Sequence, residues 1–292
     1  MLKEPQVSVI IPTVDRADAL YNLLIQLQKQ SYSYYEIVVV EQSKEIDIRI
    51  LSYVDSRSHI KLLHLTKRGL PNARNEGIKN SSGDIVLFID DDEIPDKDLI
   101  LYHVKQYEKE WVSGVGGRVS GGYDSITKDE RVGDFRELDG KVFRNFNSSI
   151  EKEVKHIAGG NMSFRRDIFN NIGFFDESYG GASIGEETDF CFRALRARHR
   201  LVFEPRAYIE HLHLQTGGCR GEKFEDWLYW CFHNSVLLAM RYMGISALLM
   251  SLVKYIARIL LFAVAKCSPN LILVGLKGLV SGTKTYRLSQ YR

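Results

Sequence analysis

The stretch Asp84-Ile85-Val86-Leu87-Phe88-Ile89-Asp90-Asp91-Asp92-Glu93 joins five consecutive apolar residues to four consecutive acidic ones. A short run that is apolar on both faces is typical of a buried strand in a parallel sheet. Ligands bind to such sheets beyond the carboxyl ends of the strands, where Asp90, Asp91 and Asp92 would then lie. Neighbouring carboxylates repel unless a cation offsets their charge, and hard divalent cations prefer oxygen ligands. The stretch therefore predicts a metal site at a sheet edge; the alternative is that Asp92 caps a helix beginning near Pro95.

Strand patterns alternate with helix patterns along the first 111 residues. Strands are expected at 7–11, where Pro12 ends the run, at 36–40, at 60–65 and from Asp84. Helices are expected up to residue 30, at 46–54, from about Pro71 and at 97–111. A less regular region is expected at 114–155. The alternation predicts an α/β fold, a mostly parallel sheet with right-handed crossovers and flanking helices.

Composition bounds the class of protein. The 292 residues, 45% hydrophobic and 26% charged, suffice for one large domain or for one domain with an appendage. Four widely spaced cysteines without a CxxC pair argue against a disulfide framework or structural zinc and fit a reducing cytoplasm. The apolar N-terminus is broken by Pro12 and lacks a small-residue cleavage pattern, so we expect a strand there and not a signal peptide.

The C-terminal region differs from the rest in charge. Residues 227–292 contain eight Lys or Arg and no Asp or Glu, whereas the remainder has 31 basic and 37 acidic residues. Aliphatic residues accompany these cations, which favours an anionic membrane surface over nucleic acid as the partner. Lys254 and Arg258 interrupt the apolar segment 245–265 on one helix face. We expect a helix lying in the membrane interface; a helix packed on the catalytic domain or on a second copy, and a membrane span, are the alternatives.

Three segments carry a family resemblance. They are Val9-Ile10-Ile11-Pro12-Thr13, Gly69-Leu70-Pro71-Asn72-Ala73-Arg74-Asn75-Glu76-Gly77 and Phe88-Ile89-Asp90-Asp91-Asp92-Glu93-Ile94-Pro95. In this order they resemble the nucleotide-binding half of a family 2 glycosyltransferase with the GT-A fold. The resemblance implies a GT-A catalytic domain at 1–215, with a nucleotide-binding half (1–98) and an acceptor-side half (99–215). A basic, apolar, helical region would then follow at 216–292.

The resemblance also implies which residues bind the donor, a nucleotide sugar. Asp90 would face the ribose, and Asp92 would bind a divalent metal, Mn²⁺ or Mg²⁺, on the diphosphate. Glu41 stands where the family usually has the Asp that contacts the base, so the base stays open, with UDP or dTDP favoured over GDP. Arg74 would supply a fixed positive charge, or alternatively be solvated on a helix surface. The full set expected around the nucleotide is Pro12, Thr13, Asp15, Arg16, Glu41, Arg74, Asp90 and Asp91.

A second acidic cluster, Gly185-Glu186-Glu187-Thr188-Asp189-Phe190, precedes apolar residues at helical spacing. A helix N-terminus favours an ionised carboxylate, the state that takes a proton from an acceptor hydroxyl. The cluster resembles the family's Glu-Asp motif, which implies Glu187 as the catalytic base. Glu186 is a rival, because an alignment error of one residue would exchange the two. The structural alternative is that both merely satisfy the helix dipole.

Residues 202–211 resemble the family strand that ends in a histidine ligand of the metal, which implies His211. His213 would share the same face if the strand continued, so either imidazole is a candidate. A nitrogen ligand among oxygens favours Mn²⁺ over Mg²⁺. Gly160 and Asn161 are implied to lie beside the donor sugar and the acceptor; alternatively the glycine pair marks a turn before an edge strand.

These observations predict a glycosyltransferase that moves a sugar from a nucleoside-diphosphate sugar to an acceptor hydroxyl, with metal dependence and inversion. The resemblance implies a glycan or lipid-linked acceptor in bacterial surface-polysaccharide or glycolipid synthesis. We expect a cytoplasmic enzyme, peripheral on the inner face of the cell membrane, with no nucleic-acid partner; a homo-oligomer formed through the C-terminal helices is a further option. The alternatives are a non-catalytic nucleotide- or glycan-binding partner in a membrane-bound assembly and a sugar nucleotidyltransferase. The loop after the first strand lacks the glycines that a nucleotidyltransferase would have.

Overall fold

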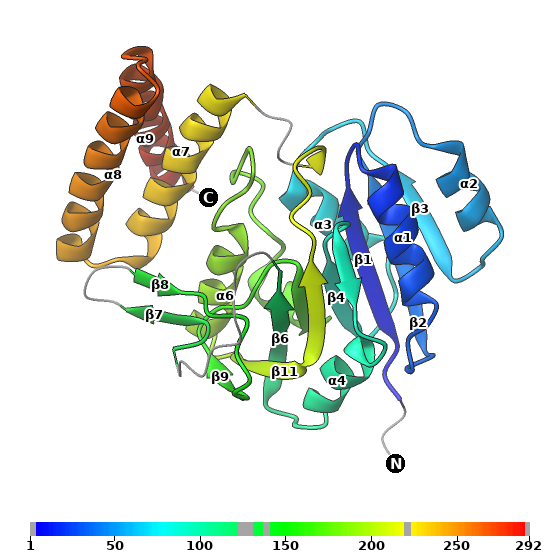
Figure 1. Ribbon diagram of the computed structural model, residues 1–292. Coiled ribbons are helices and arrows are strands. Elements are labelled where there is room, and N and C mark those ends of the chain that lie inside the picture. The colour runs from blue at the N-terminus through cyan, green and yellow to red at the C-terminus, as the bar shows by residue number, and fades with distance from the viewer. Residues whose placement is uncertain (1–3, 122–130, 137–140, 219–222, 290–292) are drawn as a thin grey trace.

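The computed structural model describes residues 4–121, 131–136, 141–218 and 223–289. Its centre is a nine-stranded mixed sheet flanked by helices, which confirms the predicted α/β fold (Figure 1). The N-terminal strands are parallel in the order β3-β2-β1-β4. They are β1 (Val7–Thr13), β2 (Tyr35–Glu41), β3 (Ile60–His64) and β4 (Ile85–Ile89). Because parallel strands end at the same edge, the residues that follow them meet there.

Helices cover both faces of this parallel half. They are α1 (Ala17–Leu27), α2 (Ile48–Asp55) and α3 (Leu70–Lys79). Successive strand side chains alternate between faces, so Val9 packs in the cluster that includes Leu23 of α1, and Ile10 in the one that includes Ala73 of α3. Burial on both faces explains why the strands are apolar without interruption.

Residues 93–211 complete the sheet in the order β10-β6-β11-β5, with β9 paired to β11. Their strands are β5 (Glu93–Pro95), β6 (Val112–Ser120), β9 (Lys152–Val154), β10 (Asn161–Arg165) and β11 (Arg200–His211), and a separate ribbon pairs β7 (Asp134–Arg136) with β8 (Lys141–Phe143). Their helices are α4 (Leu99–Gln106), α5 (Ile168–Ile172) and α6 (Glu186–Arg196). β10 runs antiparallel to both β4 and β6, so the sheet is mixed.

Some local expectations are wrong. The region expected to be irregular from residue 114 begins inside β6, whose glycines weaken the strand pattern. A Cβ at Gly114 would lie 2.7 Å from side-chain atoms of Phe164 and Leu201, so these bulky neighbours fill the space that glycine leaves. β10 lies inside the sheet and is not an edge strand. Asp92 is not a helix cap, because β5 intervenes and the N-cap of α4 is Asp98.

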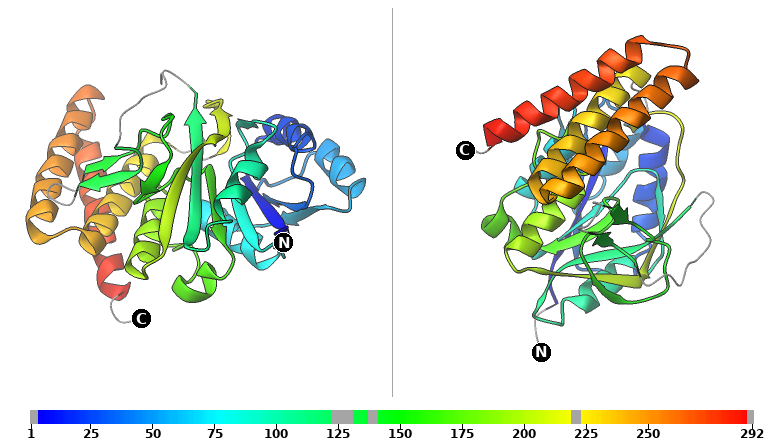
Figure 2. Two further views of the ribbon diagram at one scale, coloured as in Figure 1. Left: turned by 90° about the horizontal axis from the view of Figure 1, so that it is seen from below. Right: turned by 90° about the vertical axis from the view of Figure 1, so that its left-hand side faces the viewer.

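Three long helices form a layer beside the sheet (Figures 1 and 2). They are α7 (Phe224–Tyr242), α8 (Ile245–Ala265) and α9 (Asn270–Ser289), and the helix expected at 245–265 is confirmed. Their shared apolar cluster includes Phe232, Ile259 and Leu279. Within the described residues, α8 alone has the length and apolar composition of a helix that could cross a membrane.

A buried polar network joins α4 to β10. Both ring nitrogens of His103 are engaged, Nδ1 with Ser163 Oγ at 2.9 Å and Nε2 with Asn161 Oδ1 at 2.8 Å. The hydroxyl of Tyr107 also reaches Ser163 Oγ, at 2.8 Å. Desolvation by burial lowers the pKa of His103 to about 4, so the imidazole is neutral at pH 7.

This network makes stability depend on pH. The pKa of a histidine in an unfolded chain is about 6.5, so below that pH the unfolded state binds a proton that folded His103 does not. The contribution of neutral His103 to the free energy of unfolding is therefore complete above about pH 6.5. It falls by about 3 kcal/mol in all as the pH falls toward 4. Urea unfolding at pH 7 and pH 4.5 should show this loss, and His103→Gln should show a shallower dependence. The same slope in both proteins would contradict the prediction.

Candidate active site

A cavity of about 620 Å³ opens at the carboxyl ends of β1 and β4. Eight of the residues expected at the donor or the metal line it, namely Pro12, Thr13, Asp15, Arg16, Asp90, Asp91, Asp92 and His211. They come from the loop after β1, the loop after β4 and the end of β11, so segments distant in sequence converge on one edge of the sheet.

The acidic loop is formed by Asp90, Asp91 and Asp92, and among the described residues Arg16 is the cation nearest to it on the cavity side. Its Nη1 lies 2.9 Å from Asp91 Oδ1 and 3.1 Å from Asp92 Oδ2. Its remaining nitrogens donate to the carbonyls of Leu214 and Thr216, at 3.2 and 3.0 Å. The guanidinium therefore ties the loop after β1 to the acidic loop and to the segment that follows β11.

The two carboxylates differ in their protonation behaviour. Burial raises the pKa of Asp91 to about 6, although hydrogen bonds from Arg16 and from Thr13, 2.7 Å away, oppose the rise. Burial acts in the same direction on Asp92, but the hydrogen bond from His211, the charge of Arg16 and the hydrogen bond from the backbone N–H of Leu214 outweigh it and lower the pKa. Asp92 is thus held ionised, the state a metal ligand needs.

Asp92 and His211 offer a partial set of metal ligands. His211 Nε2 lies 3.2 Å from Asp92 Oδ1, so one oxygen and one nitrogen converge at the cavity wall. β11 ends at His211, and His213 has left the strand with φ 52°, although its ring stays 4.0 Å from that of His211. No cluster of three or more His, Cys, Asp or Glu suited to a metal occurs among the described residues. An oxygen and a nitrogen are donors that a divalent ion accepts, so this pair could supply two ligands of such an ion.

Glu93 follows the acidic triplet and is fully buried. Burial and the charges of Asp90 and Asp92 raise the pKa of Glu93 well above its ordinary value. One of its oxygens accepts a hydrogen bond from the backbone N–H of Asp90 at 3.1 Å. A Cβ at Gly160 would lie 2.8 Å from Asp90 Oδ2 and would overlap Glu93. Glycine at this position therefore lets the backbone approach the acidic loop.

Arg74 links the two acidic clusters. Its side chain is 1% exposed, which excludes the alternative of a solvated helix-surface arginine. Its Nη1 forms an ion pair with Glu186, and its Nη2 lies 3.0 Å from the carbonyl of Gly159 and 3.6 Å from Asp90 Oδ1. Breaking a buried ion pair costs about 3–5 kcal/mol. Glu186 is therefore held by this pair.

Glu187 has a different environment from Glu186. The side chain of Glu186 is 1% exposed, whereas Glu187 is half-buried. The Cγ of Glu187 lies 3.7 Å from the position of a Cβ on Gly159, which is also beside Arg74. Both residues begin α6, as expected, but they do not line the cavity beside Asp92.

Two other expected residues have side chains that are already engaged. Asn161 is fully buried and donates to the carbonyls of Arg118 and Ala207, at 3.1 and 3.0 Å. Glu41 accepts hydrogen bonds from the backbone N–H groups of Gln42 and Ser43 at 3.0 and 2.8 Å. Asn161 thus joins β6 to β11, Glu41 holds the loop after β2, and neither side chain lines the cavity.

Several further residues line the cavity that were not expected from the sequence. They are Val14, Gln42, Arg68, Gly69, Leu70, Gly181, Ala182, Gly217 and Gly218. Gln42 accepts from the N–H of Gly69 at 2.7 Å, and Arg68 pairs with Asp15 at 2.9 Å. The glycine pairs at 180–181 and 217–218 are the sequence signal that could have indicated these loops, because three of the four residues have the positive φ that favours glycine.

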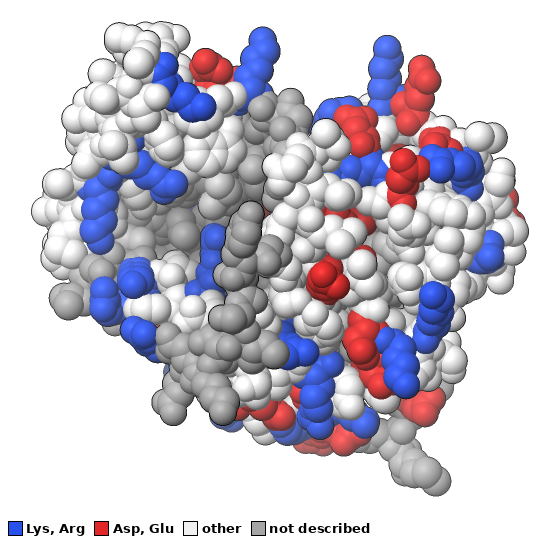
Figure 3. Space-filling view, viewed as in Figure 1, with Lys and Arg blue, Asp and Glu red and all other residues white. Residues whose placement is uncertain are grey.

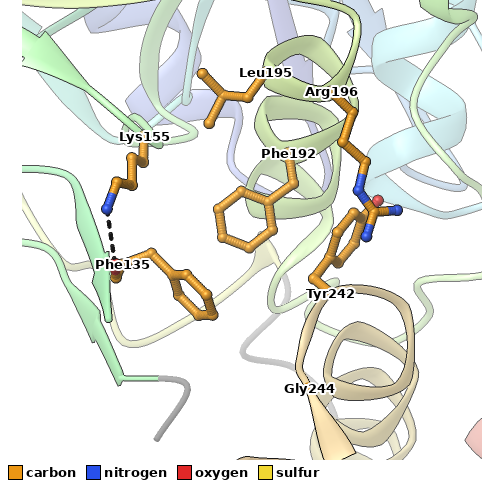
Figure 4. A pocket seen from close by; sticks show the side chains of 7 residues that line it. All are labelled: Phe135, Lys155, Phe192, Leu195, Arg196, Tyr242 and Gly244. Atoms are coloured by element: carbon orange, nitrogen blue, oxygen red, sulfur yellow. Dashed lines mark hydrogen bonds between the residues drawn. The ribbon is translucent and has the colours of Figure 1, made fainter. Parts of the chain in front are cut away.

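A second hollow, of about 300 Å³, lies between β7, α6 and the turn from α7 to α8 (Figure 4). Phe135, Phe192 and Tyr242 supply apolar walls, and Lys155 and Arg196 lie at its sides. Lys155 is already engaged, with Asp134 at 2.9 Å and the carbonyl of Phe135 at 3.0 Å. None of the expected site residues lines this hollow.

The fold and the cavity together define an α/β protein with a cavity lined by acidic residues at the carboxyl edge of its sheet. Residues 8–173 match the model of the glycosyl transferase family 2, and the chain belongs to this family. The predicted class, a glycosyltransferase, is confirmed by the same match and by the relatives below.

Among curated proteins, a glucosyl-dolichyl phosphate glucuronosyltransferase of Haloferax volcanii is 26% identical over 70% of this chain and 69% of its own length. A pre-mycofactocin glycosyltransferase of Mycobacterium tuberculosis is 24% identical over 71% of this chain, but only 43% of that relative is matched. The chain therefore spans less than half of some curated relatives.

Among solved structures, a mannosyltransferase of Pyrobaculum calidifontis in complex with GDP-Man and Mn²⁺ matches 97% of this chain and 76% of its own, at a TM-score of 0.60 and 16% identity. The expected GT-A architecture is confirmed by such neighbours.

Proposed function

We propose that the protein transfers a sugar from a nucleoside-diphosphate sugar to an acceptor hydroxyl with inversion at the sugar. The observation that carries this proposal is the cavity where the loop after β1, the acidic triplet and His211 converge. The acceptor oxygen attacks the anomeric carbon, the bond to the diphosphate breaks, and the diphosphate oxygen keeps the electron pair. Glu187 takes the acceptor proton. Inversion follows from one displacement, since no separate nucleophile was identified in the sequence.

The donor is proposed to occupy the 620 Å³ cavity. Asp90, at 34% side-chain exposure, is assigned to the ribose. Two structural neighbours support a nucleotide donor, one by its complex with GDP-Man and the other by its complex with UDP and GalNAc. For this chain we propose UDP or dTDP ahead of GDP; the base itself stays open, because Glu41 replaces the aspartate usual in the family.

Asp92 and His211 are proposed to hold the divalent ion, with Mn²⁺ favoured by the imidazole nitrogen. The structures of the Pyrobaculum calidifontis mannosyltransferase and of GalNAc-T7, which is 15% identical at a TM-score of 0.66, were both solved with Mn²⁺. When bound, such an ion neutralises the negative charge that develops on the departing diphosphate. Arg16 would have to share Asp91 and Asp92 with it, since the guanidinium lies 2.9 and 3.1 Å from their oxygens.

Glu187 is proposed as the base ahead of Glu186. A base must be free to receive a proton, and Glu186 is buried in the ion pair with Arg74. Glu187 starts the same helix, where the dipole favours its ionised form, and it is half-buried.

The donor site can be tested by calorimetric titration of UDP, dTDP and GDP with and without Mn²⁺. We expect metal-dependent binding of one nucleotide, weakened at least about tenfold in Asp92→Ala, because a direct metal ligand is removed. Asp96→Ala, an exposed carboxylate of the same segment, is the matched control and should bind like the wild type. Metal-independent binding, or equal binding by both variants, would contradict the metal assignment.

The base can be tested with two isosteric variants. Glu187→Gln should keep nucleotide affinity and lower kcat by about 10²- to 10⁴-fold, the usual contribution of a general base. Glu186→Gln should instead lower the stability to urea, because Arg74 loses its charged partner. Transfer from the identified donor to a glycolipid extract measures kcat. A larger loss of kcat in folded Glu186→Gln than in Glu187→Gln would reverse the assignment.

A lipid-linked acceptor at an anionic membrane surface is proposed from the C-terminal helices. On the face in Figure 3, Lys and Arg surround the hollow beside these helices, while most of the Asp and Glu lie over the nucleotide-binding half. α8 exposes Ile245, Val253 and Val264 at 79%, 68% and 76%. The Haloferax volcanii relative is named a glucosyl-dolichyl phosphate glucuronosyltransferase, which supports a lipid-linked acceptor here. We propose that α8 lies in the interface of the cytoplasmic membrane surface.

Vesicle sedimentation tests this association. The triple variant Leu249→Gln/Val253→Gln/Leu260→Gln should bind vesicles of anionic lipid at least about a hundredfold more weakly, at roughly 1 kcal/mol or more for each apolar side chain. Ile48→Gln, at an equally exposed apolar residue of α2, should change nothing. Unchanged vesicle binding by the triple variant would refute the proposal, and loss of a dimer in sedimentation would assign the face to a second copy.

A further inference from the structure

The loop at 173–185, between α5 and α6, connects the C-terminal helices with the cavity. Gly181 and Ala182 of this loop line the cavity. Gly185 is the N-cap of α6, so the same loop leads directly into Glu186 and Glu187. Its conformation therefore sets both the cavity wall and the start of the helix that carries the candidate base.

Trp230 of α7 packs directly on this loop. A Cβ at Gly180 would lie 2.5–2.7 Å from ring atoms of Trp230, and a Cβ at Gly181 2.7 Å from its side chain. Such distances are too short for real Cβ atoms, so the indole fills the space next to the glycine backbone. Gly181 also has φ +60°, which favours glycine.

Asn234 fixes the loop by a hydrogen bond. Its Nδ2 donates to the carbonyl of Gly180 at 3.0 Å. The side-chain orientation is set by His233, whose Nδ1 lies 2.9 Å from Asn234 Oδ1 and whose Nε2 lies 3.0 Å from Thr285 Oγ1 of α9. His233 and Asn234 are 2% and 1% exposed, so the contact is shielded from water.

A second attachment joins α7 to α6 and to the first part of the loop. Arg241 Nη1 donates to Asp189 Oδ1 at 2.8 Å, and its Nη2 lies 2.7 Å from Asp176 Oδ2. Tyr242 also donates to Asp189 Oδ1 at 2.8 Å. Asp189 is fully buried, so this pairing resists competition by water and holds α6 against α7.

From these contacts we infer that Trp230 and Asn234 are positioning residues for transfer, and that α7 is part of the active-site structure. They hold the glycine loop against the cavity and fix the start of α6. The loop also has internal bonds, such as Ser183 Oγ to the carbonyl of Tyr179 at 3.1 Å, but these do not anchor it to another element. The contacts of the loop do not depend on the proposed function. The inference rests on that function only where it says that the loop sets the geometry of the donor and the base.

A double-mutant cycle tests the Trp230 contact. Gly180→Ala places a methyl group against ring atoms that Trp230→Leu removes. We expect Gly180→Ala to weaken binding of the nucleotide chosen by calorimetry at least about fivefold in the wild-type background, and to have no effect in the Trp230→Leu background. Hydrogen exchange of peptides covering 178–187 should follow the same pattern on the same proteins. Gly180→Ala should accelerate it in the wild-type background and have no effect in the Trp230→Leu background.

Asn234→Asp tests the hydrogen bond with an isosteric change. The carboxylate keeps the contact with His233 but cannot donate to the carbonyl of Gly180, so exchange at 178–187 should rise and nucleotide binding should weaken about fivefold. Asp226→Asn, at an exposed residue of the first turn of α7, is the matched control and should change neither.

The outcomes separate this inference from the proposed function. Unchanged loop exchange in Asn234→Asp, or equal damage by Gly180→Ala in both backgrounds, would overturn the positioning role. If no nucleotide binds the wild type, the proposed function fails, and the exchange experiment still decides whether α7 holds the loop. Thermal unfolding of each variant excludes global unfolding as the cause.

Discussion

Repulsion among the carboxylates at the sheet edge is the constraint on which the site depends. Asp90, Asp91, Asp92 and Glu93 follow one strand, and Glu186 and Glu187 begin a helix that faces them through Arg74. The protein offsets this charge by several means. Arg16 pairs with Asp91 and Asp92, buried Arg74 pairs with Glu186, and burial raises the pKa of Glu93 well above its ordinary value, which favours the uncharged acid.

These compensations also assign different roles to similar residues. The pairing with Arg74 distinguishes buried Glu186 from half-buried Glu187, although the two are adjacent in sequence. Likewise, the pKa of Asp92 is lowered while that of Asp91 is raised, because His211 hydrogen-bonds to Asp92 whereas Asp91 is the more deeply desolvated. Environment, more than residue type, therefore decides which carboxylate can hold a cation or take a proton.

The C-terminal helices combine two physical properties. One side of α7 meets the catalytic part through Trp230, Asn234 and Arg241. α8 instead leaves apolar side chains such as Val253 and Val264 exposed. A membrane surface proposed for α8 would thus be connected to the cavity through α7, which shares an apolar cluster with α8 and contacts the loop before α6.

The sequence by itself determined the α/β class, the parallel N-terminal strands and the position of the acidic triplet at their edge. These features depend on local periodicity and on a rule that applies to every parallel sheet. It also indicated His211 and the two candidate bases. Only the tertiary structure decided that residues 112–120 form a strand, that Asn161 joins β6 to β11 while Glu41 holds the loop after β2, and that Trp230 and Asn234 hold the loop before α6. The physical reason is that these features arise from contacts between residues distant in sequence, such as Gly114 with Phe164, which local patterns do not record.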